Sequence, residues 1–406
     1  MQVKCFLPMN ILLKILMFLL IIILWVGCKC NNNGLVDFTG QSMGSATPSF
    51  TGPLNLFGSA VSISSDYAII GAAGENEGKG AAYLFKRNVD SWDQLRRIGG
   101  SDNTGLFGVS VSIDSDYAIV GAANVNAGNG AAHIYKRTGD QWEEEDILFP
   151  DDNDSNFGVS VSINGDYAII GAKSGNNVGS VYIFKQNGTQ WEKEDILVPS
   201  YQIPDSEFGS SVSINGSYII VGAQRYENHG KVYIYEMENN SWIQKATFDG
   251  ESNSLFGASV SINGIFAIVG APLHNNDNGT QAGSAYIYKR VNMEFGAQWL
   301  PDSTFIANDG KDYDNFGCSV SIYARSESGG FAIIGAQSND NEQGVNAGAA
   351  YSLITANGSW MHYLKLIPAP DSENDTFGDA VSISNGYAIV GAPHKDNSSG
   401  CVYFYD

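Results

Sequence analysis

One phrase recurs seven times along the chain, and this repetition constrains the fold more than any other feature of the sequence. Each copy begins with Phe-Gly, continues through Ser-Ile and ends on Gly-Ala, as in "FGVSVSIDSDYAIVGA". The copies begin at Phe57, Phe107, Phe157, Phe208, Phe256, Phe316 and Phe377, so consecutive starts lie 48 to 61 residues apart. A unit that recurs at such a period buries its apolar faces by stacking against its neighbours. We therefore expect residues 57–406 to form one repeat domain.

Each repeat reads as four short strands. In the second repeat they are "FGVSVSI", "YAIVGA", "GAAHIYKR" and a strand that opens at Trp142. Short turns rich in Asp, Asn, Ser and Gly separate the first strand from the second, which is typical of hairpins. Beyond the N-terminal leader, apolar residues do not recur at the helical period. Seven such units predict an all-β fold: a seven-bladed β-propeller with four-stranded antiparallel blades.

The seventh repeat ends at Asp406 after its third strand, so its fourth strand must come from elsewhere. "SATPSFTGPLNLFG" (residues 45–58) is similar to "QKATFDGESNSLFG" (residues 244–257), which joins one repeat to the next. We expect residues 44–51 to complete the last blade, which would remove an open sheet edge. The predicted domains are a signal segment at 1–28, a flexible tether at 29–43 and the propeller at 44–406.

The phrases "FG…V…GAP" at residues 256–272 and 377–393 resemble FG-GAP repeats, known from the propeller of integrin α subunits and from many bacterial surface proteins. The resemblance covers the chain after the leader and implies a propeller with a role in adhesion. It also implies calcium loops of the form Asp-x-Asp-x-Asp-Gly between the first two strands. The corresponding turns here read SSD, DSD, NGD, NGS, NGI, YARSESGG and SNG, without the spaced carboxylates that calcium needs. We therefore expect these calcium sites to be missing, and the matrix binding of integrins, which needs a β partner chain, is not carried over.

The N-terminus reads as an export signal. Residues 9–28 hold a lysine, an apolar run and a small residue before Cys28. The end of this segment resembles a bacterial lipobox, in which Cys28 would receive a lipid, although Trp25 is bulky for its position. An ordinary cleaved signal and an uncleaved anchor stay open as alternatives, but the apolar run is shorter than the ~20 residues of a spanning helix. We expect an exported protein, secreted or held at the cell surface or outer envelope, that meets a membrane only through this segment.

Composition narrows the partners further. The chain has 43 Asp and Glu against 22 Lys and Arg, a formal net charge of −21. Nucleic-acid binding needs a basic stripe with interleaved aromatic residues, which the sequence lacks, so nucleic acid is not an expected partner. Cys318 and Cys401 stand where other repeats have mostly small residues, and we expect two buried free thiols.

Loops of variable length define a predicted ligand face. The loops between second and third strands emerge on the same side of a propeller as the loops between blades. The longest are residues 272–283 and 337–348. Binding usually resides in variable loops on a rigid scaffold. The candidate ligand-binding residues on this face are His274, Asn276, Asp277, Asn278, Asp340, Glu342 and His394.

Carboxylates are concentrated in the loops between blades. The best candidate for a metal is the loop "DGKDYD", in which Asp309, Asp312 and Asp314 offer the oxygen ligands that calcium prefers. Two further groups are Asp151, Asp152 and Asp154, and Asp371, Glu373 and Asp375. The alternative is that all of these are solvated turn residues, because Asp favours turns through local hydrogen bonds. No other cofactor is indicated.

No catalytic motif stands out. The sequence lacks a His-Glu-x-x-His zinc motif and a phosphate-binding loop. His133 stands where other repeats have Tyr, which indicates a packing role. The leading hypothesis is a surface binding or adhesion module that recognises an extracellular protein or a glycan through the loops of repeats five to seven. A hydrolase or lyase acting on polysaccharide, which would need a perturbed carboxyl group in a central pocket, and a structural envelope scaffold are the alternatives.

Overall fold

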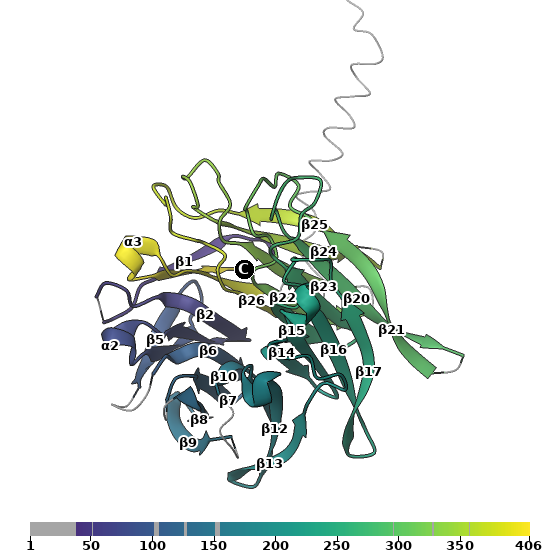
Figure 1. Cartoon of the computed structure of the whole chain (residues 1–406). Coiled ribbons are helices and arrows are strands. Elements are labelled where there is room, and N and C mark those ends of the chain that lie inside the picture. The colour runs from purple at the N-terminus through teal and green to yellow at the C-terminus, as the bar shows by residue number, and fades with distance from the viewer. Residues whose placement is uncertain are drawn as a thin grey trace, which may run out of the picture. The chain divides into compact units, whose positions relative to one another are not determined.

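The chain forms a ring of seven four-stranded sheets around a central channel (Figure 1). The computed structural model describes residues 38–50, 52–100, 105–125, 128–150, 155–294, 296–326, 329–356 and 358–406. Neighbouring strands within each sheet pair antiparallel. The predicted seven-bladed β-propeller with four-stranded antiparallel blades is therefore confirmed. We number the blades 1 to 7 in the order of their inner strands along the chain.

The four strands of each blade follow one another from the channel outwards. The inner strands are β2 (Phe57–Ser64), β6 (Phe107–Asp114), β10 (Phe157–Asn164), β14 (Phe208–Asn215), β18 (Ser259–Asn263), β22 (Val320–Ser326) and β26 (Val381–Ser384). The second strands are β3 (Tyr67–Ala72), β7 (Tyr117–Ala122), β11 (Tyr167–Ala172), β15 (Tyr218–Ala223), β19 (Phe266–Ala271), β23 (Gly329–Ala336) and β27 (Tyr387–Ala392). The third strands are β4 (Ala81–Arg87), β8 (Ala131–Thr138), β12 (Ser180–Asn187), β16 (Lys231–Glu238), β20 (Ser284–Met293), β24 (Ala349–Ala356) and β28 (Cys401–Tyr405). The outer strands are β5 (Trp92–Gly99), β9 (Gln141–Leu148), β13 (Gln190–Leu197), β17 (Ser241–Asp249), β21 (Gly296–Phe305), β25 (Ser359–Leu366) and, for blade 7, β1 (Ser42–Ala46).

The repeated Phe-Gly and Gly-Ala pairs meet where one blade packs on the next. A Cβ atom on Gly171 of β11 would overlap the carbonyl oxygen of Gly209, which belongs to the Phe-Gly pair of the following blade. All seven blade boundaries repeat this arrangement. The pairs are Gly71 with Gly108, Gly121 with Gly158, Gly171 with Gly209, Gly222 with Gly257, Gly270 with Gly317, Gly335 with Gly378, and Gly391 with Gly58. Glycine is required there because the backbones of adjacent blades approach too closely for any side chain.

A ladder of serine hydroxyls links the inner strands around the channel. An inner strand has one edge without a strand neighbour, so its backbone N–H groups need other acceptors. The Ile214 N–H donates to Ser162 Oγ of the preceding blade at 3.2 Å. The other pairs, at 3.1 to 3.2 Å, are Ile63 with Ser382, Ile113 with Ser62, Ile163 with Ser112, Ile262 with Ser213, Ile322 with Ser261, and Ile383 with Ser321. The regular serines therefore link the inner strands around the ring.

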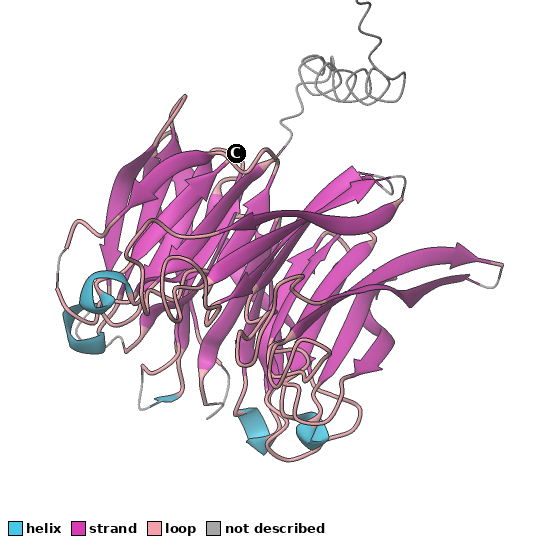
Figure 2. Ribbon diagram, turned by 90° about the horizontal axis from the view of Figure 1, so that it is seen from above, coloured by secondary structure: helices cyan, strands magenta, loops and turns pink. Residues whose placement is uncertain are grey.

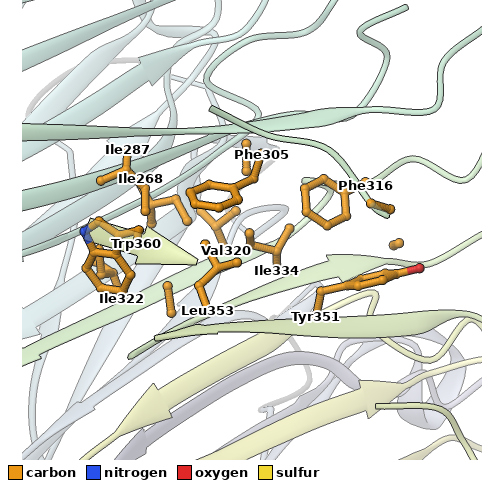
Figure 3. Close-up of a cluster of buried hydrophobic side chains, with 14 of the residues drawn as sticks. Ile268, Ile287, Phe305, Phe316, Val320, Ile322, Ile334, Tyr351, Leu353 and Trp360 are labelled. Atoms are coloured by element: carbon orange, nitrogen blue, oxygen red, sulfur yellow. The ribbon is translucent and has the colours of Figure 1, made fainter. Parts of the chain in front are cut away.

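Apolar side chains fill the space between blades. Figure 3 shows this core between blades 5 and 6, where Phe305, Val320, Ile334 and Trp360 lie together. The Phe of each Phe-Gly pair meets a ring on the third strand edge-on, with centroids 5.1 to 5.4 Å apart. Those rings are Tyr83, His133, Tyr182, Tyr233, Tyr286, Tyr351 and Tyr403. His133 thus makes the packing contact that Tyr makes elsewhere.

An N-terminal strand completes blade 7, as expected, but it spans Ser42–Ala46 rather than residues 44–51. β1 pairs antiparallel with β28, with Ser45 opposite Tyr403. Residues just before β1, which the sequence analysis assigned to a tether, also pack on the propeller. Phe38 is buried, with 1% of its surface exposed, and the Thr39 N–H donates to the Asp406 carbonyl at 2.7 Å. The described part of the propeller therefore begins at least as early as residue 38.

Candidate functional site

Two sets of loops share one side of the propeller. Figure 2 shows the short helical turns of the second-to-third-strand loops along the same side. They are α2 (Glu75–Gly78), η2 (Gly175–Asn177), η3 (Tyr226–Asn228) and α3 (Lys395–Ser398). The segment entering each next blade runs beside such a loop, as where the Leu106 N–H donates to the Gly78 carbonyl at 2.9 Å and the Tyr313 N–H to that of Thr280 at 2.8 Å. We call this side the ligand face.

The long loops of blades 5 and 6 are held in shape by their own polar side chains. Asn276 Nδ2 donates to the Gly283 carbonyl at 2.7 Å, and Asn278 Nδ2 donates to the Ala307 carbonyl at 2.6 Å. In blade 6, Asp340 Oδ1 accepts a backbone N–H from six residues later at 2.8 Å. These candidate ligand-binding groups therefore already stabilise the loops that carry them.

The two candidate histidines lie in different blades and have separate partners. His274 contacts Ser284 Oγ through Nδ1 at 2.7 Å and Glu251 through Nε2 at 3.1 Å. His394 contacts Thr376 Oγ1 through Nδ1 at 2.9 Å. Each imidazole is thus engaged within its own part of the ligand face, and the two do not share a contact.

The aspartates of the "DGKDYD" loop also point to separate partners. Asp309 accepts hydrogen bonds from Lys365 Nζ at 2.6 Å and from the Tyr351 hydroxyl at 2.7 Å. Although burial alone would raise the pKa of Asp309, these two bonds hold it below its ordinary value. Asp312 accepts the backbone N–H of Thr280 at 2.7 Å and so fastens this loop to blade 5.

Asp314 is the buried member of this loop, with 1% of its surface exposed. It accepts hydrogen bonds from Asn339 Nδ2 at 2.7 Å and from the Lys311 N–H at 2.9 Å. Burial raises the pKa of this carboxyl group. Among the residues that the structure describes, no group of three or more His, Cys, Asp and Glu is placed to hold a metal ion.

A hollow of about 410 Å³ opens on blade 6 between the same loops. Its lining residues are Asp309, Lys311, Asp340, Asn341, Glu342, Lys365 and Ile367. We call it the blade 6 pocket. It brings together Asp340 and Glu342, predicted to bind a ligand, with Asp309, predicted to bind a metal. The other candidates, His274, Asn276, Asp277, Asn278, Asp312, Asp314 and His394, lie outside its lining.

A continuous chain of hydrogen bonds lies behind this pocket. Lys365 Nζ bridges Asp309 to Asn339 Oδ1, the latter at 3.0 Å, and Asn339 in turn holds Asp314. Asn339 has no exposed surface. Fully bonded polar networks of this kind fix the side chains that they contain. Lys311 completes the wall, with its Nζ 3.3 Å from the Asp340 carbonyl. The pocket therefore presents donors and acceptors side by side, of which Lys365 and Asp309 are held by this network.

A second hollow, of about 280 Å³, occupies the ligand-face end of the channel. Asp379 is the only carboxylate among its described lining residues, where corresponding positions hold Ser59, Val109, Val159, Ser210, Ala258 and Cys318. Burial raises the pKa of Asp379 to about 6. Burial and the Asp379 charge also raise the pKa of the Cys318 thiol to about 12. Sequence reasoning missed Asp379, although it is the one acidic residue at this position among the seven repeats.

Comparison with known proteins identifies the family. A family model described as FG-GAP repeat matches residues 47–85, 142–184, 191–235, 246–288, 299–354 and 360–405. The chain belongs to the FG-GAP repeat family. No sequence among curated proteins matches this FG-GAP repeat protein. A crystal structure of a protein from Lactobacillus plantarum is similar in fold, with a TM-score of 0.51 and 12% identity over 77% of this chain and 85% of that chain.

Several predictions concern the thiols and the N-terminal segment. Cys318 and Cys401 are free, as expected, but only Cys401 is buried and Cys318 is half-buried. Cys28, the signal at 1–28 and the aspartates at 151, 152 and 154 lie outside the described residues. Within the described part of the chain, no helix has the length and hydropathy of a membrane span.

Proposed function

We propose that this FG-GAP repeat protein is an exported binding module that recognises a glycan in the blade 6 pocket. The observation that carries the proposal is the pairing of ammonium donors with carboxylate acceptors around one hollow. Lys311 and Lys365 supply ammonium donors, and Asp340 and Glu342 supply carboxylate acceptors. A sugar hydroxyl both donates and accepts, so such a mixed lining suits a ligand rich in hydroxyl groups.

The hydrogen bonds that the pocket's side chains already make favour a glycan over a metal ion as the ligand. A calcium ion needs six to eight oxygen ligands around one point. Asp309 is already bonded to Lys365 and Tyr351, and the Lys365 ammonium lies where it would repel a cation. A neutral sugar would keep these pairs intact and bond to the outer lone pairs of Asp340 and Glu342, both of which are exposed.

Export is part of the proposal and rests on the sequence. Residues 9–28 have the lysine, apolar run and terminal small residue of a secretory signal, with Cys28 as the candidate lipidation site. A glycan would meet an exported protein at the cell surface or in the medium.

One observation favours polysaccharide cleavage as a second function. Asp379, whose pKa is raised to about 6, lies in the channel hollow and is suited to general acid or base chemistry. Glycoside hydrolysis usually needs two carboxyl groups about 5 to 10 Å apart. Asp379 has no second carboxylate beside it among the described lining residues of that hollow. Binding is therefore the function that the geometry supports better.

A glycan array probed with the full chain tests the proposal. We expect a discrete set of neutral or acidic glycans to bind, and Glu342→Gln to weaken that binding roughly tenfold through loss of one charged hydrogen bond. Glu192→Gln, on the outer strand of blade 3, is the matched control and should leave binding unchanged. The proposal would be overturned if no glycan on the array bound, if only proteins bound, or if Glu342→Gln did not alter glycan binding.

A further inference from the structure

A hollow of about 330 Å³ lies between blades 1 and 2, and blade 7 separates blade 1 from blade 6. Its lining residues are Arg96, Arg97, Ile98, Gly99, Phe107, His133, Tyr135, Glu144 and Ile147. We call it the blade 1–2 cleft. It combines two arginines, a histidine, a tyrosine and a glutamate, in a chain with twice as many acidic as basic residues.

The seven repeats can be compared position by position. The residues at the positions that line this cleft differ in charge between blades. The position of Arg96 holds Asp146, Asp195, Ala246, Ser303 and Leu364 in the outer strands of blades 2 to 6. The position of His133 holds Tyr in the six other blades. An imidazole in place of a phenol ring and two guanidinium groups thus lie at this one blade boundary. The other boundaries pack without these groups.

Hydrogen bonds to two glutamates hold the cleft's polar groups in place. Arg97 is hydrogen-bonded through Nε at 2.8 Å to Glu75, which has no exposed surface. His133 Nδ1 lies 2.7 Å from Glu144 Oε1, and the Tyr135 hydroxyl donates to the same oxygen at 3.1 Å. Burial and the Glu144 charge raise the pKa of Tyr135, so its hydroxyl stays protonated and keeps donating.

Arg96 is exposed, and it differs from Arg97 because it forms no ion pair within the described residues. Its guanidinium nevertheless lies close enough to Tyr135 to act on it electrostatically. An exposed arginine that lines a hollow offers a planar pair of donors that matches a carboxylate.

We propose that the blade 1–2 cleft binds a carboxylate-bearing sugar, a uronate. The Arg96 guanidinium takes the sugar carboxylate, and Glu144 and His133 take its hydroxyl groups. A simple anion would offer no hydroxyl groups to Glu144 and His133, and a neutral sugar would offer no charge to Arg96. A uronate carries both the charge and the hydroxyl groups that this lining matches. The inference is independent of the blade 6 pocket, which shares no lining residue with the cleft.

Titration calorimetry of the full chain with four small probes tests this inference. The probes are glucuronate, galacturonate, glucose and acetate. We expect at least one uronate to bind, with glucose and acetate at least tenfold weaker. Arg96→Gln should weaken uronate binding roughly tenfold, since it removes a charge-assisted hydrogen bond. Arg225→Gln, which changes an arginine that is 65% exposed in blade 4, is the matched control and should have no effect.

Two further variants separate this site from structural effects and from the blade 6 pocket. His133→Tyr restores the residue of the other repeats, so it should keep the melting temperature and still weaken uronate binding. Glu342→Gln should leave uronate binding here unchanged. Failure of both uronates to bind, equal binding of glucose or acetate, or uronate binding that survives Arg96→Gln would overturn the inference.

Discussion

Phe38 packs edge-on against Phe331, with the ring centroids 6.0 Å apart. The contact joins the segment before β1 to the second strand of blade 6. At five other boundaries a Trp of the outer strand makes this contact with the second strand of the preceding blade. These pairs are Tyr67 with Trp142, Tyr117 with Trp191, Tyr167 with Trp242, Tyr218 with Trp299, and Phe266 with Trp360. Blade 7 lacks the Trp, and Phe38 takes its place.

We predict that Phe38→Ala lowers the free energy of unfolding by about 3 to 5 kcal/mol, the range for truncating a buried Phe. Denaturant unfolding of the full chain, followed by tryptophan fluorescence, measures the change. Phe149→Ala is the matched control, because Phe149 is 49% exposed, and it should change stability by less than about 1 kcal/mol. Equal effects of the two substitutions would show that Phe38 does not close the ring.

Gly171→Ala should prevent blades 3 and 4 from packing, because the new Cβ would overlap the carbonyl oxygen of Gly209. We expect a loss of at least about 2 kcal/mol or no soluble protein, since overpacking at a backbone contact cannot be relieved by a rotamer change. Gly188→Ala is the control. Gly188 has open space around it and only a positive φ of 68°, so its replacement should cost about 1 kcal/mol. Thermal melts compare the two, and a Gly171 variant as stable as the Gly188 variant would contradict the close approach.

Asp379→Ser should stabilise the protein at neutral pH. The folded-state pKa of about 6 lies above the ordinary value of an Asp, so the folded state holds this proton more tightly than the unfolded state does. The contribution of Asp379 to the free energy of unfolding therefore falls as pH rises from about 4 to about 6 and stays low above that. We expect the variant to gain about 1 to 3 kcal/mol at pH 7.5 and little at pH 4. A gain that does not change with pH would refute the assignment of a raised pKa.

Ser162→Ala should leave the Ile214 N–H without its acceptor at the edge of β14. An unsatisfied backbone group costs about 1 to 3 kcal/mol, and we expect a loss in this range in equilibrium unfolding. Ser241→Ala, at an exposed position of β17, is the matched control and should be close to neutral. If Ser162→Ala were also neutral, the serine ladder would not contribute to closing the ring.

The blades could be predicted because the sequence repeats. The candidate site could not, because its side chains find their partners in loops and strands that are far away in the sequence. Strand limits and the N-terminal closure follow from local pattern and copy number, which the sequence displays directly. Phe38 escaped prediction because it fills the place of a Trp without sharing its residue type or spacing. Asp309 looked like a calcium ligand because its neighbours in sequence are acidic. Its actual partners, Lys365 and Tyr351, lie more than forty residues away on β25 and β24.

Hydrogen–deuterium exchange of the full chain, with and without a glycan that binds on the array, shows directly where the glycan is bound. We expect the glycan to slow exchange in residues 309–311 and 339–342, which line or support the blade 6 pocket. The inner-strand turns on the opposite side, such as residues 165 and 216, should be unaffected. Slowed exchange at those turns, or none in blade 6, would contradict recognition of the glycan by the blade 6 pocket.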